Sequence, residues 1–322
     1  MKTKEKTPKD NAFDVVGICH PKWRGIRAAT YSLVPRVFEV SEINSYSEAQ
    51  NIASEIMKVR PQKVVLSGYP RGYNLLAKAL KKKSPTTRIF FLSHTPFTWY
   101  FGREMEVSWL KDMFEAYDKG YIEKIGFAKK DTFIYFKNKG VNAFFVMNRP
   151  PEFKVSHHKP RKGRPQIGVW GSNMWHRNLL NQIIAGSMIK SSKIHVNEVP
   201  DYFFWDNKRI KRYGILPREK YLLVLKSMDI NLYVSFTECF PMTVIESMAY
   251  SIPCLVSDTS EVYTWSKYLK NNLVVSKIDS PISIKEKIEW VFKHYKKIQS
   301  EMAIYLPVLN KKIERSIKDF LK

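Results

Sequence analysis

The chain has 322 residues, 44% of them hydrophobic and 14% aromatic, and its 54 Lys and Arg against 30 Asp and Glu give a formal charge of +24. This composition excludes an intrinsically disordered chain. No apolar run reaches the roughly 18 residues that a transmembrane helix needs. The basic charge fits nucleic acid, an anionic membrane surface or an anionic substrate, and it also fits a lysine-rich soluble enzyme without an electrostatic role.

The N-terminus and the cysteines favour a reducing compartment. The first ten residues are charged, and no apolar segment of signal-peptide length follows them, so we expect a cytoplasmic protein. Cys19, Cys239 and Cys254 are an odd number of cysteines without metal-ligand spacing, and we expect them to be buried thiols.

In the N-terminal half, short apolar segments alternate with segments of helical spacing. The expected strands cover residues 13–19, 63–67, 88–93 and 143–147, and the expected helices cover 47–59, 72–83, 104–119 and 131–139. A loop is expected at 20–27, after the first strand. Because most of these strands are apolar throughout, the pattern predicts a parallel sheet in a doubly wound α/β domain at 1–150.

A change of composition marks the middle of the chain. Residues 149–165 carry four prolines and no apolar periodicity, which predicts an interdomain linker at 151–165. The alternation then resumes, with strands expected at 166–170, 193–196, 229–234 and 252–256, and helices at 177–190, 217–227 and 241–250. We therefore expect a second α/β domain at 166–304.

The tail from 282 onward is helical in pattern, with an interruption expected near Pro307. Its last part, about 305–322, is expected to pack back on the first domain. The whole chain is thus predicted to form two α/β domains that face each other across a cleft. Ligands in such domains bind outside the carboxyl ends of the strands, so the loops of interest are 20–27, 94–103, 171–176 and 235–241.

The segment from Ser235 to Asp258 carries the most specific signal. Glu238 and Glu246 are separated by seven residues, and Met-Ala-Tyr-Ser-Ile-Pro and an apolar strand follow. With these flanks the segment resembles the signature of group 1 (family 4) retaining glycosyltransferases, and the likeness extends through 167–178 and 213–220. The resemblance implies the GT-B architecture of two Rossmann-like β/α/β domains. It also implies sugar transfer from a nucleotide-sugar to an acceptor hydroxyl with retention of configuration.

The resemblance assigns a role to each of three residues. Glu246 would accept hydrogen bonds from the ribose hydroxyls of the donor, and the competing interpretation is an exposed helical glutamate. Glu238 would contact the transferred sugar, and its alternative is a residue that interacts with the helix dipole. Arg177 would neutralise the diphosphate leaving group, in place of a metal. No Asp-x-Asp sequence or histidine ligand pattern is present, so no metal or other cofactor is expected.

Further residues are implied near the donor. His94, at the end of an apolar strand, would lie near the donor sugar or the acceptor, or would be a loop histidine without such a role. Backbone amides at the start of a helix can hold phosphate oxygens. The remaining donor-binding candidates are Gly25, Gly171, Asn173, Ile215, Leu216, Phe240, Pro241, Met242 and Thr243.

The sequence departs from the family pattern at two places. Ser251 stands where the family usually has glycine, and a left-handed backbone there would cost about 1 kcal/mol relative to glycine. The first loop has only Gly25, where many members of the family have paired glycines. The resemblance therefore does not define the backbone geometry of residues 22–27.

The acceptor separates the alternatives that remain. UDP- or GDP-sugars are the preferred donors, and a glycan, lipid-linked or protein-linked hydroxyl is the preferred acceptor. An aromatic stretch at 97–101 is either a lipid or glycan contact or a buried cluster. Docking at an anionic membrane surface, transfer to DNA bases and a non-catalytic or epimerase role of a sugar-nucleotide-binding protein stay open.

Overall fold

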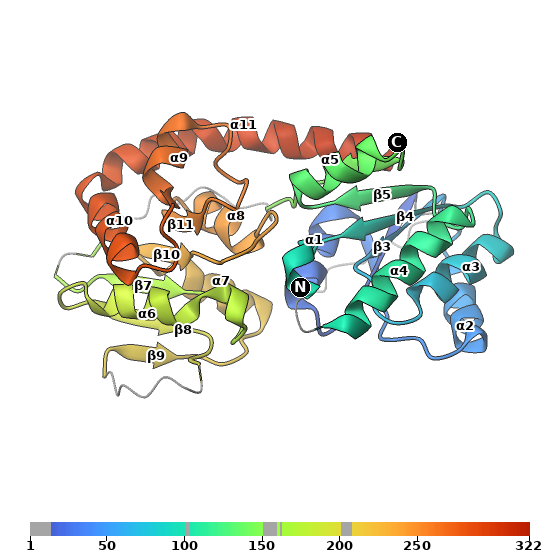
Figure 1. Cartoon of the computed structure of the whole chain (residues 1–322), viewed down its shortest axis with the longest axis horizontal. Coiled ribbons are helices and arrows are strands. Elements are labelled where there is room, and N and C mark those ends of the chain that lie inside the picture. The colour runs from blue at the N-terminus through green and yellow to red at the C-terminus, as the bar shows by residue number, and fades with distance from the viewer. Residues whose placement is uncertain (1–13, 101–102, 151–159, 162, 201–207) are drawn as a thin grey trace, which may run out of the picture. The chain divides into compact units, whose positions relative to one another are not determined.

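The structure is a computed structural model that describes residues 14–100, 103–150, 160–161, 163–200 and 208–322. The chain forms two compact units, which we call unit 1 (Met1–Val146 with Ser316–Lys322) and unit 2 (Met147–Arg315). Most of the predicted linker, 151–159 and 162, lies outside the described residues. Figure 1 shows that each unit alternates strands with helices along the chain.

Unit 1 is built on a six-stranded parallel sheet with the strand order β2-β1-β3-β4-β5-β6. Its strands are β1 (Val15–Cys19), β2 (Arg36–Glu39), β3 (Lys63–Ser67), β4 (Arg88–Ser93), β5 (Lys124–Phe127) and β6 (Ala143–Phe145). Its helices are α1 (Arg24–Leu33), α2 (Tyr46–Met57), α3 (Tyr73–Lys83), the short 3₁₀ helix η1 (Phe97–Tyr100), α4 (Glu104–Asp118) and α5 (Lys130–Asn138).

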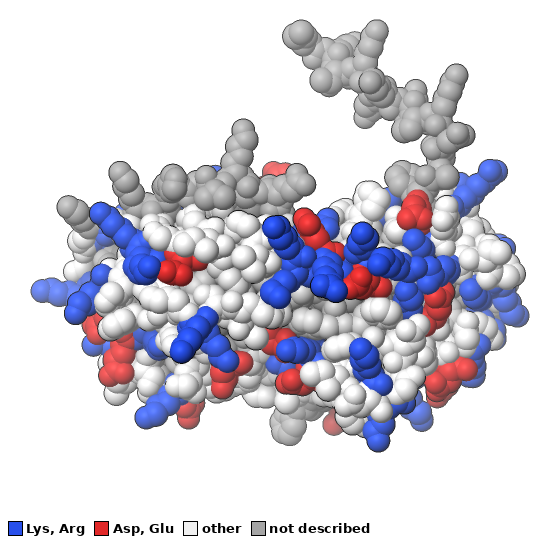
Figure 2. Space-filling view, turned by 90° about the horizontal axis from the view of Figure 1, so that it is seen from above, with Lys and Arg blue, Asp and Glu red and all other residues white. Residues whose placement is uncertain are grey.

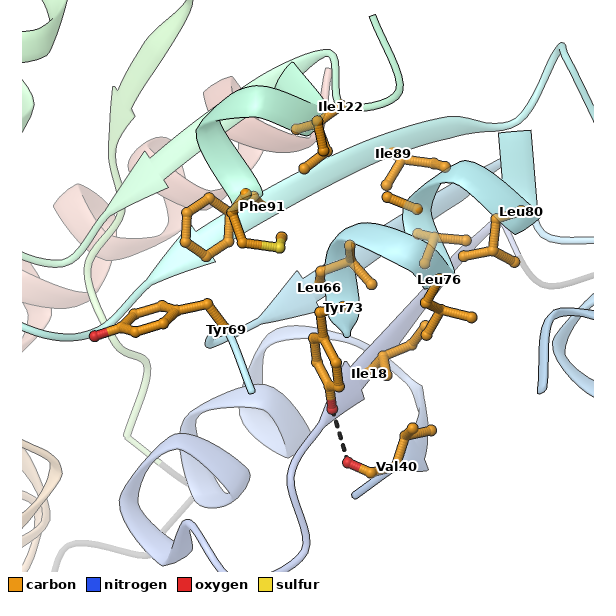
Figure 3. Close-up of a cluster of buried hydrophobic side chains, with 14 of the residues drawn as sticks. Ile18, Val40, Leu66, Tyr69, Tyr73, Leu76, Leu80, Ile89, Phe91 and Ile122 are labelled. Atoms are coloured by element: carbon orange, nitrogen blue, oxygen red, sulfur yellow. Dashed lines mark hydrogen bonds between the residues drawn. The ribbon is translucent and has the colours of Figure 1, made fainter. Parts of the chain in front are cut away.

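One face of this sheet is covered by α2, α3 and α4. Ile18, Leu66 and Phe91 from three strands pack against the apolar faces of these helices in one buried cluster (Figure 3). Burial of such side chains is the main favourable contribution to folding. Tyr73 lies inside the cluster and donates its hydroxyl hydrogen to the carbonyl of Val40 at 2.8 Å, so its polar atom is satisfied.

The end of the last helix, α11 (Tyr295–Leu321), belongs to unit 1. Phe320 is buried there, with ring centroids 5.4 Å from Phe90 and 6.1 Å from Phe144. Gly126 of β5 makes this packing possible, because a Cβ at that position would lie 3.1 Å from the Phe320 ring. Residues 316–322 thus complete the core of unit 1.

Unit 2 contains a second six-stranded parallel sheet, with the order β12-β11-β10-β7-β8-β9. Its strands are β7 (Gln166–Val169), β8 (Lys193–Val196), β9 (Ile210–Arg212), β10 (Ile230–Tyr233), β11 (Cys254–Ser257) and β12 (Val274–Val275). Its helices are the 3₁₀ helix η2 (Trp175–Arg177), α6 (Leu179–Ser187), α7 (Arg218–Leu225), α8 (Met242–Ala249), α9 (Lys267–Leu273), α10 (Pro281–Lys293) and most of α11.

Polar side chains fix the packing of the central strands in unit 2. Asn231 of β10 accepts a hydrogen bond from the Trp170 indole at 2.6 Å and donates one to the Ser247 hydroxyl of α8 at 3.0 Å. Both partners and Asn231 itself are buried. Gly168 leaves the space for the indole, because a Cβ there would lie 2.5 Å from the indole nitrogen. These hydrogen bonds therefore fix the position of α8 relative to β10 and to the end of β7.

Two expectations about local structure are wrong. The predicted loop 20–27 is shorter, because α1 begins at Arg24. The predicted interruption near Pro307 is also absent, because Pro307 lies inside α11. The helical tail is interrupted at His294 instead, between α10 and α11. Pro307 and Ala303 are both exposed, so water can hydrogen-bond the carbonyl that the proline leaves without an amide partner.

Several short elements were not predicted from the sequence: α1, β2, β5, β9, α9 and β12. The edge strands β2 and β9 are partly exposed and contain arginine or lysine, so they lack the apolar pattern of the inner strands. The three cysteines are buried free thiols, as expected. Among the described residues, no helix is long and apolar enough to cross a membrane.

The positive charge on the visible face of the molecule is divided among many separate side chains (Figure 2). On the face shown in Figure 2, Lys and Arg side chains are scattered, with Asp and Glu side chains between them. Several pairs of opposite charge are close enough to interact, among them Arg88–Glu123 at 2.5 Å and Lys285–Glu289 at 2.8 Å. Exposed pairs of this kind contribute little to stability.

Candidate functional site

The strand order places a topological switch point in unit 2. From β7 the chain continues to β8 and β9 on one side, and it then returns to form β10 and β11 on the other side. The carboxyl ends of β7 and β10 are therefore neighbours, and the loops that follow them diverge there. Open α/β sheets bind their ligands at such a point. The loops 170–178 and 234–241 form the candidate site.

Buried hydrogen bonds tie these two loops together. The Asn178 side chain donates to the carbonyl of Val234 at 3.0 Å, and the amide of Val234 donates to the Gln182 side chain at 2.8 Å. The amide of Phe236 donates to the carbonyl of His176 at 2.8 Å. Asn178 has a left-handed backbone with φ of 53°, which asparagine tolerates better than most residues. The loops consequently form one rigid unit.

Arg177 and Glu238, both predicted as catalytic residues, form an ion pair in this site. Arg177 ends η2, and Glu238 lies in the loop after β10. The guanidinium also donates to the Tyr233 hydroxyl at 2.7 Å and lies 5.3 Å from the centre of that ring. Both charged side chains are largely buried. The structure therefore brings the two residues together, with each neutralising the other.

Glu246 forms a second ion pair. It lies on α8 with no exposed surface, and one oxygen, Oε1, accepts a hydrogen bond from Arg218. The other oxygen, Oε2, is buried without a hydrogen-bond partner. Burial raises the pKa of Glu246, and the charge and hydrogen bond of Arg218 oppose that rise. The alternative of an exposed helical glutamate is wrong, because the carboxylate is inside the protein.

Arg218 was not predicted as a site residue. It is the first residue of α7, in the segment 213–220 that carries part of the family resemblance. A cation in the first turn of a helix faces the positive end of the dipole. An arginine at such a position therefore needs a partner elsewhere, and this signal was available in the sequence.

The loop after β7 contains two further predicted residues. Asn173 is exposed, and its backbone N–H donates a hydrogen bond to the carboxylate of Glu198 at 2.6 Å. Gly171 is half-buried, and a Cβ there would lie 3.4 Å from the Arg177 side chain. The glycine thus leaves Arg177 room to pack against the loop backbone.

The remaining donor-binding candidates of unit 2 lie around α7 and α8. Ile215 is 69% exposed and Leu216 is half-buried, just before α7. Phe240, Pro241 and Met242 are buried, and the carbonyl of Phe240 accepts a hydrogen bond from Asn148 at 2.6 Å. Thr243 is half-buried, with its hydroxyl 2.9 Å from that of Tyr221. Helix α8 begins at Met242, one residue later than expected.

The other two candidates, His94 and Gly25, belong to unit 1. His94 follows β4, and its Nε2 lies 2.8 Å from the hydroxyl of the buried Ser67. The Ser67 hydroxyl lies 2.7 Å from that of Thr30. Gly25 is exposed in the first turn of α1, with open space where a Cβ would be. The aromatic stretch forms η1 in part: Phe97 is 43% exposed, the Arg103 guanidinium lies 4.6 Å from the Trp99 ring, and Phe101 lies outside the described residues.

No metal site is evident in the part of the chain that the structure describes. There, no group of three or more His, Cys, Asp or Glu side chains could hold a metal ion. The cationic side chain of the candidate site that pairs with Glu238 is Arg177, and Arg218 pairs with Glu246 on α8 beside it.

Comparisons with known proteins agree with this fold. The model of the family described as "Glycosyl transferases group 1" matches residues 207–305. No curated protein sequence matches the chain significantly. Among solved structures, an α,α-trehalose-phosphate synthase (UDP-forming) from Burkholderia xenovorans in complex with glucose-6-phosphate has a TM-score of 0.62. It is 10% identical, and the alignment covers 96% of this chain and 100% of that chain.

Two other solved structures are similar over most of the chain. One, "Trehalose-6-phosphate from E. coli bound with UDP-2-fluoro glucose", has a TM-score of 0.56 at 11% identity, and the match covers 86% of this chain and 77% of that chain. The other, a putative UDP-N-acetylglucosamine 2-epimerase from Listeria monocytogenes, has a TM-score of 0.56 at 10% identity and 91% coverage of both chains. The fold of two Rossmann-like domains with the GT-B architecture is confirmed. So is the resemblance to group 1 glycosyltransferases, whose family model matches residues 207–305.

Proposed function

We propose that this protein transfers a sugar from a nucleotide-sugar to an acceptor hydroxyl on a glycan, a lipid-linked or a protein-linked substrate. The transfer retains the anomeric configuration and needs no metal. The observation that carries the proposal is that two buried glutamates, Glu238 and Glu246, are each paired with an arginine, and that both glutamates lie in the segment 207–305 that matches group 1 glycosyltransferases. The match and the fold support sugar transfer, and the donor, the acceptor and the stereochemistry are our proposals.

The donor binds at the switch point of unit 2. Arg177 holds the diphosphate, because a guanidinium binds phosphate oxygens with charge-assisted hydrogen bonds. Backbone amides at the start of α8 contact phosphate or sugar oxygens as well. Glu246 binds the ribose hydroxyls, and Ile215 and Leu216 frame the base. UDP or GDP is the nucleotide of choice in this proposal.

The same residues act on the reaction. The bond between the anomeric carbon and the diphosphate breaks while the oxygen of the acceptor hydroxyl forms the new glycosidic bond from the same face of the sugar, and the hydroxyl proton passes to the departing diphosphate. Arg177 stabilises the negative charge that develops on the leaving diphosphate. Glu238 binds hydroxyls of the transferred sugar and adds negative potential beside the developing oxocarbenium ion. Binding of the diphosphate to Arg177 separates the Arg177–Glu238 pair in part and frees Glu238 for the sugar.

His94 is assigned to the sugar or acceptor side of the reaction. Its Nε2 lies 2.8 Å from the hydroxyl of the buried Ser67, and this hydrogen bond orients the ring at the end of β4.

A panel of UDP-, GDP-, ADP- and dTDP-sugars in a thermal-unfolding assay tests the proposal. A cognate donor at 100 times its Kd should stabilise the protein by about 2.7 kcal/mol. Product analysis by NMR with that donor then reads the anomeric configuration. If no nucleotide-sugar or nucleoside diphosphate binds, the proposed function is wrong.

Two alternatives remain for the same fold. Similarity to a putative epimerase structure supports isomerisation of the sugar-nucleotide instead of transfer, which the NMR assay detects as a changed donor without an acceptor. The formal charge of +24 supports docking at DNA or at an anionic membrane. Duplex-DNA binding over a salt series and flotation with anionic liposomes separate these two surfaces.

A further inference from the structure

Arg218 and Glu246 differ from an ordinary surface ion pair. Glu246 has no exposed surface, whereas the Arg218 side chain is 34% exposed. The pair thus runs from the interior to the surface, with the carboxylate at the buried end. An isolated carboxylate in such a position would take up a proton, because burial disfavours the charged form. The guanidinium counteracts this effect.

The two carboxylate oxygens have different surroundings. Oε1 accepts the hydrogen bond from Arg218, and Oε2 is buried without a hydrogen-bond partner. A buried acceptor without a donor costs free energy, and it is an unusual feature for a group that has a purely structural role. A ligand hydroxyl would supply the missing donor.

Other titratable groups near Glu246 are tyrosines. Tyr221 on α7 is half-buried, and Tyr250 follows α8. Burial is the main cause that raises the pKa of each, and the charge of Glu246 adds to it. Neither tyrosine therefore titrates between pH 6 and 9. Arg218 is the cationic group that acts on Glu246.

We propose that Arg218 is a positioning residue of the donor site, on which selection of the nucleotide by Glu246 depends. It supplies the counter-charge for buried Glu246, so that the free oxygen Oε2 selects nucleotides that carry ribose hydroxyls. This inference rests on the proposed function, because it assumes that a nucleotide binds beside α8. Arg218 acts through Glu246 and is a positioning residue in this sense.

The test measures binding of nucleoside diphosphates by calorimetry. The diphosphate that binds the wild-type protein is compared with its 2′-deoxy and 3′-deoxy analogues at pH 6, 7, 8 and 9. A hydrogen bond to a charged group contributes enough for a difference of about 10-fold or more in Kd. We expect the wild-type protein to show this discrimination at every pH.

The variant Arg218→Met removes the charge and keeps a side chain of similar length. At pH 7 we expect its discrimination to fall to about 1- to 3-fold, because Glu246 becomes protonated and loses its acceptor strength. The discrimination should return as the pH rises. Arg218→Lys should keep most of it, and Arg212→Met, at an exposed position of β9, is the matched control that should behave as wild type.

Glu246→Gln covers the case in which Arg218→Met does not fold. The amide imitates the protonated acid, so its discrimination should be low at every pH. The inference is overturned if folded Arg218→Met discriminates as the wild-type protein does at pH 7, or if Glu246→Gln retains full discrimination. Absence of any nucleoside diphosphate binding to the wild-type protein would instead contradict the proposed function itself.

Discussion

The strand ends of the two units carry different kinds of polar group. In unit 2, Glu238 in the loop after β10 and Glu246 on α8 are both buried, and each is paired with an arginine. In unit 1, the hydroxyl of Ser67 at the end of β3 lies 2.7 Å from that of Thr30 on α1 and 2.8 Å from Nε2 of His94, which follows β4. Buried charges require partners, and neutral hydroxyls require only hydrogen bonds.

This difference suggests a division of work. A site that contains guanidinium groups suits a charged diphosphate, and a site of hydroxyls and a histidine suits an uncharged sugar or hydroxyl. If the division is correct, substitutions in unit 2 should change binding and turnover of the nucleotide part. Substitutions in unit 1 should act on transfer more than on nucleotide binding.

The largest effect is expected for Arg177→Ala. It removes the positive charge assigned to the leaving diphosphate and leaves Glu238 without its partner, so kcat should fall by about 10²- to 10³-fold. The measurement is steady-state transfer with the cognate donor. Arg177→Lys should recover part of the loss, and a wild-type kcat in Arg177→Ala would remove this assignment.

The second largest effect is expected for Glu246→Ala. Loss of the ribose contacts should raise the donor KM and lower kcat/KM by about 10- to 100-fold. Glu219→Ala, on the exposed side of α7, is the control and should leave both parameters unchanged. Wild-type kinetics in Glu246→Ala would show that the buried carboxylate does not contact the donor.

His94→Ala tests the hydrogen-bonding group of unit 1 that contains Thr30, Ser67 and His94. Transfer should fall by about 10-fold or more, whereas the Kd of the nucleoside diphosphate should stay within about 2-fold of wild type. Kinetic and calorimetric measurements on the same variant separate the two effects. A large loss of diphosphate affinity would break the proposed division between the units.

A buried histidine on β8 of unit 2 should affect stability instead. His195 of β8 hydrogen-bonds Tyr213 at 2.7 Å and Gln166 at 2.8 Å. Burial lowers the pKa of His195 to about 4. The unfolded chain, with a pKa near 6.5, binds the proton more readily. Stability should therefore be full above pH 6.5 and fall by at most about 3 kcal/mol as the pH drops toward 4.

Chemical unfolding at pH 7, 6 and 5 measures this dependence. His195→Gln should be less stable than wild type at pH 7, and it should lose the contribution of His195 to the pH dependence. His294→Gln, a substitution at the junction of α10 and α11, should keep the wild-type slope. An unchanged slope in His195→Gln would contradict the expectation.

The smallest effect is expected for Ser251→Gly. Ser251 has a left-handed backbone with φ of 59°, which disfavours a side chain. Glycine there should raise the free energy of unfolding by about 0.5–1 kcal/mol, after its greater chain entropy in the unfolded state is subtracted. Urea unfolding with an unchanged slope measures this gain, and a loss of stability would indicate that the hydroxyl contributes more than the backbone strain costs.

The sequence was sufficient for most of the two sheets. The inner strands β3, β4 and β8 have the bounds that the sequence predicts, because strands buried on both faces are mostly apolar. The family resemblance also singled out Arg177, Glu238 and Glu246, and their roles in a donor site stay predictions. The short edge strands and α1 were missed, since their patterns are weak over so few residues.

Pairing and burial were decided only by the tertiary structure. Glu238 and Arg177 were assigned separate tasks, and the fold places them in one ion pair. The helical pattern around Glu246 does not show whether its side chain is exposed or buried. Packing of α8 in the tertiary structure buries it and brings Arg218 to it as a partner. Local sequence determines which residues can carry a charge. Which charges lie inside, and opposite what, depends on contacts between segments far apart in the chain, and these set the free energy of each charge.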